Sequence, residues 1–419
     1  MPRADRRKLL FLSQDLPYPP NGGARIRTFN VIKQLAHEYD ITLLSFVREK
    51  EVYEVRDLEA AKGALSQYGR VWATPLPQSV SGARFGYDHV APLLTRSVYT
   101  RYVFRSRAFK RRLLHVLRHF DPALIHSDSI DLSGYFRHVG STPIVCTHHD
   151  VQSLLLERRA AREGSRLKRW YVGAQARAMR REEVKWCPRV DLNVTVSEAD
   201  RSRLSAIAPG GRYSVVENGV DVEYFHPREG PTEGIVFVGG TSWFPNKDAL
   251  TYFGSQILPL IRRHVPGVKV RWVGRAREEE KRAAWERFGI EMTGFVEDVR
   301  PYVWAGRCVV VPIRVGGGTR VKILDAWAMG KPIVSTGIGC EGLEVEDGRD
   351  MEVADEPKHF AEAVVAVLQD EGRARRLGTE GRRKAVERYS WDQIGRRMRE
   401  TYDRLISGER PAPLESRVP

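Results

Sequence analysis

Short β-rich runs alternate with longer helical segments along almost the whole chain, and this alternation restricts the fold more than any other feature. Such repeats pack as parallel sheets covered by helices on both faces. In the first half we expect helices at 25–37 and 152–185 and strands at 9–13, 41–46, 71–73, 124–127, 144–147, 192–196 and 214–216. In the second half we expect helices at 247–262 and 278–288 and strands at 235–238, 268–273, 290–293, 308–311 and 332–335.

The segment 217–234, ENGVDVEYFHPREGPTEG, separates the two series. It is rich in Gly, Pro and charged residues, which is typical of an interdomain linker. The expected fold class is therefore α/β, with two Rossmann-like doubly wound domains that face each other across a cleft. A last helix is expected at about 382–406.

Composition excludes several classes of protein. The chain has 419 residues, 42% of them hydrophobic and 29% charged, which fits a folded protein with about two domains. The four cysteines, at 146, 187, 308 and 340, have no paired spacing, so neither a disulfide framework nor a zinc site is expected. Reduced cysteines favour the cytoplasm. The apolar run Leu9–Leu12 is too short for a signal peptide, and no run has membrane-spanning length.

The net charge of +15 predicts an anionic partner. Nucleic acid fits the charge, but the chain contains no recognised nucleic-acid-binding module, so none is expected. Residues 96–119 hold eight Lys or Arg, no acid and several aromatic residues, and 158–181 form a second basic segment. Such segments suit an anionic membrane surface, although a solvated basic helix face would look the same. The aromatic residues considered as interfacial anchors are Tyr99, Tyr102, Phe104 and Phe109.

A triple-glycine turn, Gly316–Gly318, separates an apolar strand from a helix expected to open with Thr319, Arg320 and Lys322. Glycines before a helix start let an anion approach free N–H groups, and the two cations add positive charge. Asp325, one turn further, supplies an acceptor for a hydroxyl pair. This pattern suits a sugar nucleotide, with its diphosphate at the helix start and its ribose beside it. An ordinary strand-to-helix turn with solvated side chains remains an alternative.

The first strand ends in a similar turn. Gly22 and Gly23 precede a helix that carries Arg25 and Arg27 in its first turn. This pattern predicts a second anion cradle, on the acceptor or sugar side of the cleft. Alone it is weak, because it matches neither a dinucleotide fingerprint nor a Walker loop.

Several motifs together make the chain resemble a family 4 glycosyltransferase of the two-domain GT-B architecture. They are the Gly22–Gly23 loop, THHDVQ at 147–152, VSEAD at 196–200, ENGVDVEYFHP at 217–227, FVGG at 237–240, TGFVEDVRPY at 293–302, GGGTRVKILDAWAMGKPIV at 316–334 and RYSWDQ at 388–393. The resemblance implies a retaining, metal-independent, hexosyltransferase-like enzyme. It would move a sugar from a nucleoside diphosphate to a glycan or lipid-linked acceptor, with no cofactor because the nucleotide sugar is a substrate.

The resemblance also implies a division of labour. Residues 1–225 would bind the acceptor and residues 226–381 the nucleotide sugar. A helix at 382–407 would pack back on the N-terminal domain, and 408–419 would form a disordered tail. The chain would act in cell-surface glycan or exopolysaccharide synthesis, in the cytoplasm or peripherally at the inner face of the cell membrane.

Two positions depart from the family pattern. Where the family usually carries two glutamates seven residues apart, this chain has Gly317 and Asp325. Where it usually carries an Arg after the glycine of the second domain's first strand, this chain has Gly240. A GGGTR branch of the family is the better match, in which Arg320 and Lys322 replace the usual cations. These changes leave open a catalytically weakened protein that binds sugar nucleotides without turnover.

The resemblance implies further site residues. His149 would lie near the transferred sugar, with its neighbour His148 as a core residue, although the order of the two is open. The remaining donor-side residues would be Gly240, Lys247, Phe295, Val296, Gly317, Gly318, Thr319, Glu341, Gly342 and Leu343. No metal ligand is expected.

Overall fold

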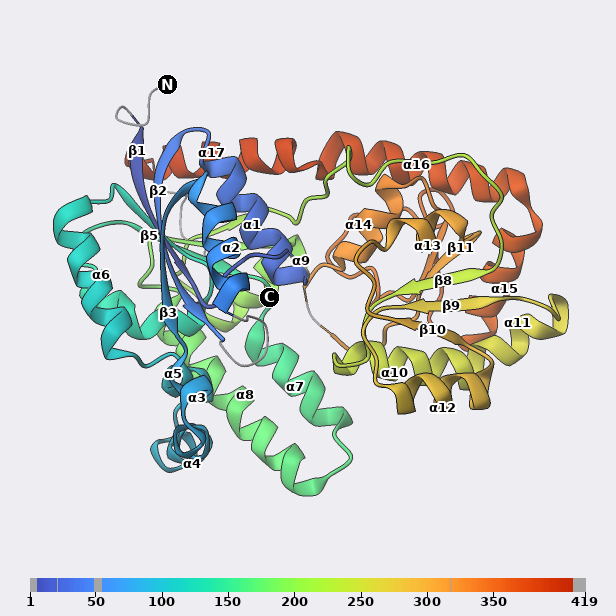
Figure 1. Ribbon diagram of the computed structural model, residues 1–419, viewed down its shortest axis with the longest axis horizontal. Coiled ribbons are helices and arrows are strands. Elements are labelled where there is room, and N and C mark those ends of the chain that lie inside the picture. Colours follow the sequence, from blue (N-terminus) through green and yellow to red (C-terminus); the bar gives the residue numbers. More distant parts are fainter. Residues whose placement is uncertain (1–5, 21, 49–54, 317, 410–419) are drawn as a thin grey trace. The chain divides into compact units, whose positions relative to one another are not determined.

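The computed structural model describes residues 6–20, 22–48, 55–316 and 318–409. They form two compact units (Figure 1). Unit 1 contains the chain up to Glu217 and the chain from Gly395 onward, and unit 2 contains Asn218–Ile394. The boundary expected at 225/226 thus falls inside unit 2. The reason is that Val220 belongs to the core of unit 2 and bridges Ser390 in parallel.

Unit 1 is built on a seven-stranded parallel sheet in the order β3-β2-β1-β4-β5-β6-β7. Its strands are β1 (Arg7–Ser13), β2 (Tyr39–Val47), β3 (Gly69–Pro75), β4 (Leu124–Ser127), β5 (Ile144–His148), β6 (Leu192–Thr195) and β7 (Tyr213–Val215). The strand order reverses between β1 and β4, and ligands of doubly wound folds bind at the carboxyl ends of strands at such a point.

Helices connect these strands (Figure 1). They are α1 (Gly23–Leu35), α2 (Val55–Ser66), α3 (Pro77–Val80), α4 (Gly82–Thr95), α5 (Tyr99–Val103), α6 (Arg107–Phe120), the 3-10 helix η2 (Ile130–His138), α7 (Gln152–Arg162), α8 (Arg166–Trp186), α9 (Glu198–Ile207) and α17 (Trp391–Ile406). Helix α6 shows how they pack: Ser106 accepts a hydrogen bond from the Phe109 N–H as N-cap, and one helix face buries Phe109, Leu113 and Val116.

Unit 2 repeats the architecture with a six-stranded parallel sheet in the order β10-β9-β8-β11-β12-β13. Its strands are β8 (Ile235–Val238), β9 (Val270–Val273), β10 (Glu291–Gly294), β11 (Cys308–Val311), β12 (Ile333–Ser335) and β13 (Glu352–Val353). Its helices are α10 (Phe244–Tyr252), the π-helix η3 (Phe253–Ile257), α11 (Leu258–His264), α12 (Glu278–Phe288), α13 (Arg300–Ala305), α14 (Val321–Ala328), α15 (Pro357–Gln369) and α16 (Glu371–Tyr389). Here the order reverses between β8 and β11.

The predicted α/β class and the parallel strands are confirmed, whereas two long helices were predicted wrongly. The helix expected at 152–185 is the hairpin of α7 and α8, because the chain turns at Gly164 and Ser165 caps α8. The helix expected at 382–406 is interrupted at Ser390, whose backbone is extended. After this break, Tyr402 of α17 is buried in unit 1, where its hydroxyl bonds His126 Nδ1. The tail expected at 408–419 lies mostly outside the described residues.

Candidate functional site

The glycine turn after β11 is folded around Arg320. Gly316 and Gly318 have φ of +154° and +66°, values that favour glycine. A Cβ on Gly316 would collide with the Arg320 guanidinium, whose Nη1 donates to the Gly318 carbonyl over 2.8 Å. Arg320 is only 4% exposed and is the N-cap of α14, so the helix begins at Val321, two residues later than expected. Thr319 is buried beside it, and Gly317 lies outside the described residues.

Lys322 is the best-defined cation of the predicted donor site. Its Nζ lies 3.0 Å from Asn246 Oδ1 and 4.0 Å from the centre of the Phe237 ring. Burial, with a smaller contribution from the charge of Arg320, holds the pKa of Lys322 well below its usual range. The ammonium is thus poorly solvated, and an anion placed beside it would favour its charged form.

The fold places this amine at the switch point of the second sheet. Phe237 lies on β8 and Lys322 follows β11, and these two strands flank the point where the order reverses. Gly239, directly after β8, has φ of +153°, and a Cβ there would lie 2.7 Å from Lys322 Nζ. Because Gly239 has no Cβ, the amine can lie close to the backbone at this point, and a phosphate cradle requires such an approach.

Asp325 lies one turn along α14 from Lys322. Burial raises the pKa of Asp325 to about 8, although the charge of Lys322 opposes the shift. Near neutral pH its carboxyl group therefore holds a proton for much of the time and can donate as well as accept hydrogen bonds. The predicted group of Arg320, Lys322 and Asp325 is thus brought together on one turn and one helix start.

Asn246 was missed by sequence reasoning. Its Oδ1 accepts from Lys322, while its Nδ2 donates to the Gly240 carbonyl over 2.8 Å. Asn246 is 5% exposed, in the first turn of α10. This one side chain therefore connects the predicted residues Lys322 and Gly240. The WFPN sequence carries the signal, since a Pro in the first helical turn followed by a polar residue marks a helix start.

Lys247 is not directed at this group in the structure. Its Nζ lies 3.0 Å from Glu280 Oε1, and Thr241 donates to the other oxygen of the same carboxylate over 2.7 Å. These hydrogen bonds from Thr241 and Lys247 lower the pKa of Glu280 to about 2. Lys247 would have to leave Glu280 in order to contact a donor.

The remaining donor-side positions occupy two other loops of unit 2. After β10, Phe295 is 59% exposed, with the Arg275 guanidinium 5.3 Å from its ring centre, while Val296 packs on the core. After β12, Gly342 has φ of +86° and the Leu343 N–H donates to the Cys340 carbonyl. Glu341 is half-buried in the same turn. Phe295 is the only residue of these loops that presents a large ring to solvent.

The first-domain turn is different from an anion cradle. Arg25 forms a two-point ion pair with Asp15, at 2.9 Å from Nε and 2.5 Å from Nη2. Arg27 is 1% exposed and donates to the carbonyls of Val216 and Glu217 over 2.8 and 2.7 Å. Gly22 is the N-cap of α1, and a Cβ at Gly22 or Gly23 would meet nothing within 4 Å. The two glycines leave open space at the helix start, while both guanidinium groups are engaged within unit 1.

The two histidines after β5 have different environments. His148 is 3% exposed, its Nε2 lies 3.0 Å from Asn193 Oδ1, and burial lowers its pKa to about 4. The His149 side chain is 19% exposed, and its Nε2 lies 3.4 Å from Asp128 Oδ1. His148 is therefore a hydrogen-bonded core residue, and His149 is the one with access to a ligand.

Asp128 is a second residue that sequence reasoning missed. It directly follows β4, at the switch point of the first sheet, and its Oδ2 accepts from Thr28 Oγ1 over 2.5 Å. Burial alone would raise the pKa of Asp128, but His149 and His126 together hold it well below its usual range. Asp128 thus joins α1, β4 and β5 through one buried carboxylate. Its position directly after a strand was the available signal.

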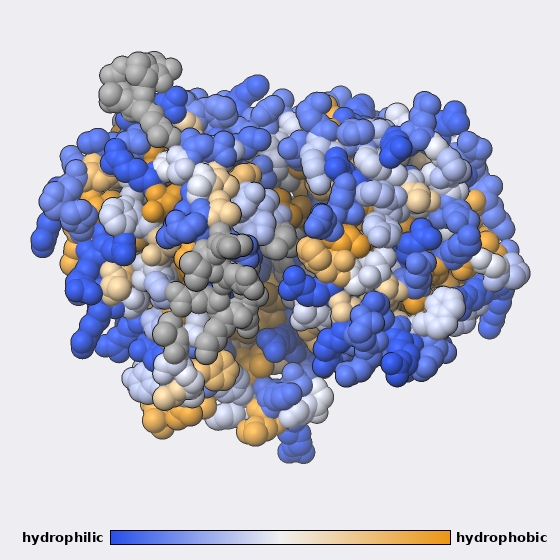
Figure 2. Space-filling view, viewed as in Figure 1, coloured by the Kyte–Doolittle hydropathy of each residue, from blue (hydrophilic) through white to orange (hydrophobic). Residues whose placement is uncertain are grey.

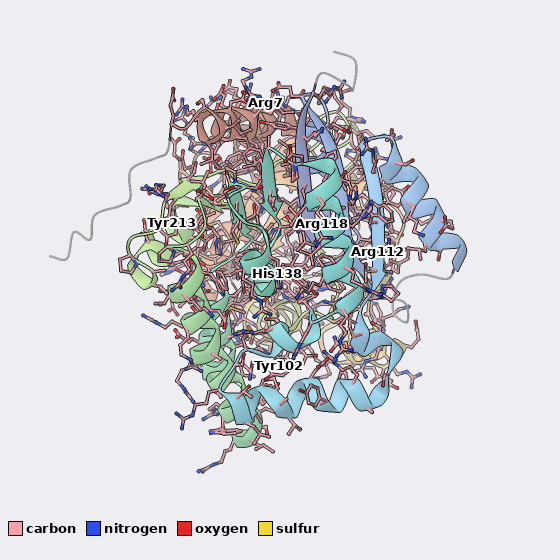
Figure 3. The ribbon with its side chains drawn as sticks, turned by 90° about the vertical axis from the view of Figure 1, so that its left-hand side faces the viewer. Arg7, Tyr102, Arg112, Arg118, His138 and Tyr213 are labelled. Atoms are coloured by element: carbon pink, nitrogen blue, oxygen red, sulfur yellow. The ribbon has the colours of Figure 1, made fainter. Side chains whose placement is uncertain are left out.

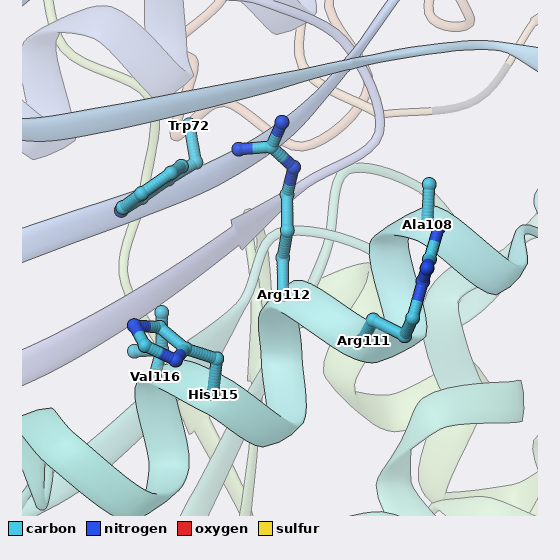
Figure 4. Close-up of a pocket in the computed structure, with 6 residues that line it drawn as sticks. All are labelled: Trp72, Ala108, Arg111, Arg112, His115 and Val116. Atoms are coloured by element: carbon cyan, nitrogen blue, oxygen red, sulfur yellow. The ribbon is translucent and has the colours of Figure 1, made fainter.

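A hollow of about 450 Å³ on unit 1 contains none of the residues predicted for the donor or acceptor side, although most of its lining belongs to the basic segment 96–119 (Figure 4). It is lined by Trp72, Ala108, Arg111, Arg112, His115 and Val116. The Arg112 guanidinium lies 4.9 Å from the Trp72 ring centre. This distance is that of a cation–π contact within unit 1. Separately, none of the described helices is long and apolar enough to cross a membrane.

Two family models match the chain. "Glycosyltransferase Family 4" matches residues 21–224 and "Glycosyl transferases group 1" matches residues 232–370. Alpha-maltose-1-phosphate synthase of Mycolicibacterium smegmatis is 25% identical over 249 residues, which are 51% of this chain and 63% of that protein. An uncharacterised 44.6 kDa protein in the cps region of Klebsiella pneumoniae is 26% identical over 139 residues, 31% of this chain and 36% of that protein. The chain thus spans less than two thirds of either relative.

Solved structures share the whole fold. Sucrose-phosphate synthase from Thermosynechococcus elongatus has a TM-score of 0.70 and 16% identity, covering 96% of this chain and 100% of that one. HepE of Anabaena in complex with UDP-glucose has a TM-score of 0.65 and 15% identity, covering 94% and 99%. TarM has a TM-score of 0.69 and 10% identity, covering 96% and 99%. At these identities the likeness shows the architecture, which is GT-B.

Proposed function

We propose, from the premise that this chain is a GT-B glycosyltransferase family 4-like protein, that it transfers a sugar from a nucleoside diphosphate to a glycan. The acceptor would be lipid-linked or a polysaccharide, and transfer would proceed with retention and without a metal. One observation carries the proposal: the amine of Lys322 lies between Asn246 and the ring of Phe237 at the switch point of the second sheet.

A diphosphate fits the electrostatics of this point. The transferred sugar leaves negative charge on the β-phosphate, and a poorly solvated cation stabilises such charge more strongly than an exposed one. Lys322 and the N–H groups at the start of α14 would meet this charge, with Arg320 holding the glycine turn in shape through its bond to Gly318. Lys322, Arg320 and Gly318 all belong to unit 2.

Asp325 would hold the ribose. A protonated carboxyl group donates one hydrogen bond and accepts others, so Asp325 can match a vicinal diol whether or not it is ionised. The aspartate is one methylene shorter than the glutamate usual in the family. Phe295, which follows β10 and exposes its ring, would contact the base.

In unit 1, His149 would contact the transferred sugar or the acceptor, oriented by Asp128. Transfer at the inner face of the cell membrane and a role in cell-surface glycan or exopolysaccharide synthesis fit the basic surface of this unit. UDP-sugars are the first donors to test, because HepE binds UDP-glucose.

The test is a thermal-shift screen of UDP-, GDP-, ADP- and dTDP-sugars, since a ligand that binds the folded state raises apparent stability. The best donor is then assayed for transfer and hydrolysis with wild type, Lys322→Ala and, as a control on the same unit, Lys247→Ala. We expect donor-dependent stabilisation that Lys322→Ala removes and Lys247→Ala largely retains. Absence of stabilisation by every donor would overturn the proposed site.

A second candidate function is a sugar-nucleotide-binding protein without turnover. It is favoured by Gly317 and Gly240, which replace an acid and a cation usual in the family. Donor stabilisation without transfer or hydrolysis for any acceptor class would select this alternative.

A further inference from the structure

Helix α4 buries a carboxylate and exposes apolar side chains. Its one carboxylate, Asp88, is fully buried and accepts from Arg84 Nε over 2.8 Å. Tyr87, Val90 and Leu94 are 51, 57 and 81% exposed, and their spacing of three and four residues places them on one helix face. The helix thus turns its polar pair toward the protein and its apolar stripe toward solvent. An exposed apolar stripe of this kind is typical of a surface that contacts a protein, a membrane or a ligand.

The stripe continues onto the start of α8. The His89 ring of α4 stacks on Tyr171 of α8 with 6.4 Å between centres, and Arg181 Nη2 of α8 donates to the Arg96 carbonyl after α4. Near Tyr171, Leu167 and Trp170 are 74 and 56% exposed. We call the exposed apolar residues of the two helices the apolar rim: Phe85, Tyr87, Val90, Leu94, Leu167 and Trp170. Figure 2 shows hydrophobic residues gathered over α4 and beside α8.

The surroundings of the apolar rim are strongly basic. All three acids of α4 and α8, Asp88, Glu182 and Glu183, are buried. In contrast, every cation of α8 is exposed: Arg166, Lys168, Arg169, Arg177, Arg180, Arg181 and Lys185. Part of this row lines a hollow of about 620 Å³. The exposed surface of the two helices therefore combines apolar side chains and positive charge, with no exposed carboxylate.

Helix α6, the basic segment singled out from the sequence, has no such apolar component. Phe109 is fully buried and Phe104 is 4% exposed in the core, so neither can serve as an interfacial anchor. The Tyr99 hydroxyl donates a hydrogen bond to Gln78. The Tyr102 hydroxyl is hydrogen-bonded to Thr95 of α4, and Figure 3 shows Tyr102 beside this helix. Of the four aromatic residues expected to face a membrane, two are thus in the core, and the half-exposed Tyr99 and Tyr102 are bonded to neighbouring side chains.

We propose that α4 and the start of α8 form a docking surface for an anionic lipid bilayer. The apolar rim enters the boundary between headgroups and acyl chains, and the cations of α8 contact the phosphates. Charge complementarity selects this occupant, because the two helices expose seven cations and no acid of their own, which matches a uniformly negative layer. One of the seven, Arg180, lies 3.8 Å from Glu157 of α7. Trp170 and Tyr87 are also residue types that prefer this boundary. The inference does not depend on the transferase activity.

The experiment measures co-sedimentation of the full chain with vesicles of phosphatidylcholine alone or mixed with phosphatidylglycerol. Val90→Ser/Leu94→Ser removes part of the apolar rim, and Trp285→Ser/Val386→Ser, two exposed apolar residues of unit 2, is its control. Lys168→Gln/Arg177→Gln removes charge from α8, and Arg107→Gln/Lys110→Gln is the matched control on α6. Trp170→Ala is a second rim variant. Thermal denaturation confirms that each variant folds.

We expect the wild-type protein to bind the anionic vesicles but not the neutral ones. Each α4 or α8 variant should lose about tenfold in partitioning, with smaller changes in the two controls. Equal losses in the α8 and α6 charge variants, or unchanged binding of both rim variants, would overturn the proposal. Conversion of an oligomer to a monomer by the rim variants, with vesicle binding unchanged, would identify an interface between copies and also overturn it.

Discussion

His149 Nε2 lies 3.4 Å from Asp128 Oδ1, and the pair joins the carboxyl ends of two neighbouring parallel strands, β5 and β4. The neighbouring His148 points into the core and bonds Asn193. Because successive side chains of a strand point to opposite sides, His148 is a structural residue whereas His149 can contact a ligand. Asp128 is itself fixed by Thr28 of α1 and lies 3.6 Å from His126 Nε2.

The first prediction separates the two histidines. His149→Ala should leave donor binding unchanged and lower turnover, because the ring is partly exposed and contacts only Asp128 among the interactions described above. His148→Ala should instead lower the melting temperature, since it leaves a cavity and an unpaired Asn193 oxygen. Calorimetry of unfolding and single-turnover kinetics measure the two effects. A fully active His149→Ala variant would return that residue to a structural role.

Asp128→Asn is the second prediction. The amide preserves the shape of the carboxylate but not its charge, so orientation of His149 should weaken while the fold is kept. We expect kcat to fall about tenfold with little change in KM, since positioning affects the transition state more than donor binding. Single-turnover kinetics with the best donor provide the measurement. An unchanged kcat would exclude the pairing of Asp128 with His149 as functional.

Lys322 provides a trade-off between stability and binding. Because burial holds the pKa of Lys322 well below its usual range, the folded state binds this proton less tightly than the unfolded state, and stability is lost as pH falls. Lys322→Met should therefore stabilise the unliganded protein while weakening donor affinity. Wild type should also take up protons on binding a nucleoside diphosphate, since the anion raises the amine's pKa. Calorimetric titrations in buffers of different ionisation enthalpy measure that uptake, and none is expected for Lys322→Met.

Asp325 predicts a dependence of stability on pH. Its folded pKa of about 8 lies above the ordinary 3.8, so the folded state binds this proton more tightly than the unfolded state. Its stabilising contribution is complete below the ordinary value and is lost as pH rises through about 8. Asp325→Asn should flatten the stability profile across that window and weaken nucleotide binding, whereas Asp325→Glu should retain binding. Denaturant titrations from acidic to alkaline pH provide the measurement; an identical slope in the Asn variant would contradict the assignment.

Arg27 is predicted to act on stability alone. Its guanidinium holds the carbonyls of Val216 and Glu217 at the end of the first part of unit 1. Burial lowers the pKa of Arg27 to about 10, so the group stays charged at neutral pH. Arg27→Met should reduce the free energy of unfolding by about 2–4 kcal/mol, because two charged hydrogen bonds are lost. KM for the donor should not change; a large increase would restore Arg27 to the anion site expected from the sequence.

The parallel sheets, the two series of strands and the glycine turn before Arg320 could be predicted from the amino-acid sequence. These features depend on local periodicity and on backbone freedom that only glycine supplies. The sequence also grouped Arg320, Lys322 and Asp325, which neighbouring turns of one helix bring together. Strand β13 was missed, since a two-residue strand carries too little pattern to identify.

The contacts of each polar side chain, in contrast, depend on how distant segments pack. The positions of Arg25 and Arg27 in the sequence predicted anion ligands. In the structure Asp15 binds Arg25, and two carbonyls distant in sequence accept hydrogen bonds from Arg27. Asn246 and Asp128 became candidate site residues because strands far apart in sequence end at the same edge of a sheet. The direction of α4 was also set by packing, since burial of the Asp88–Arg84 pair forces the apolar stripe outward. These contacts form between residues that are far apart in sequence and that folding brings together. The periodicity of a single segment therefore cannot predict them.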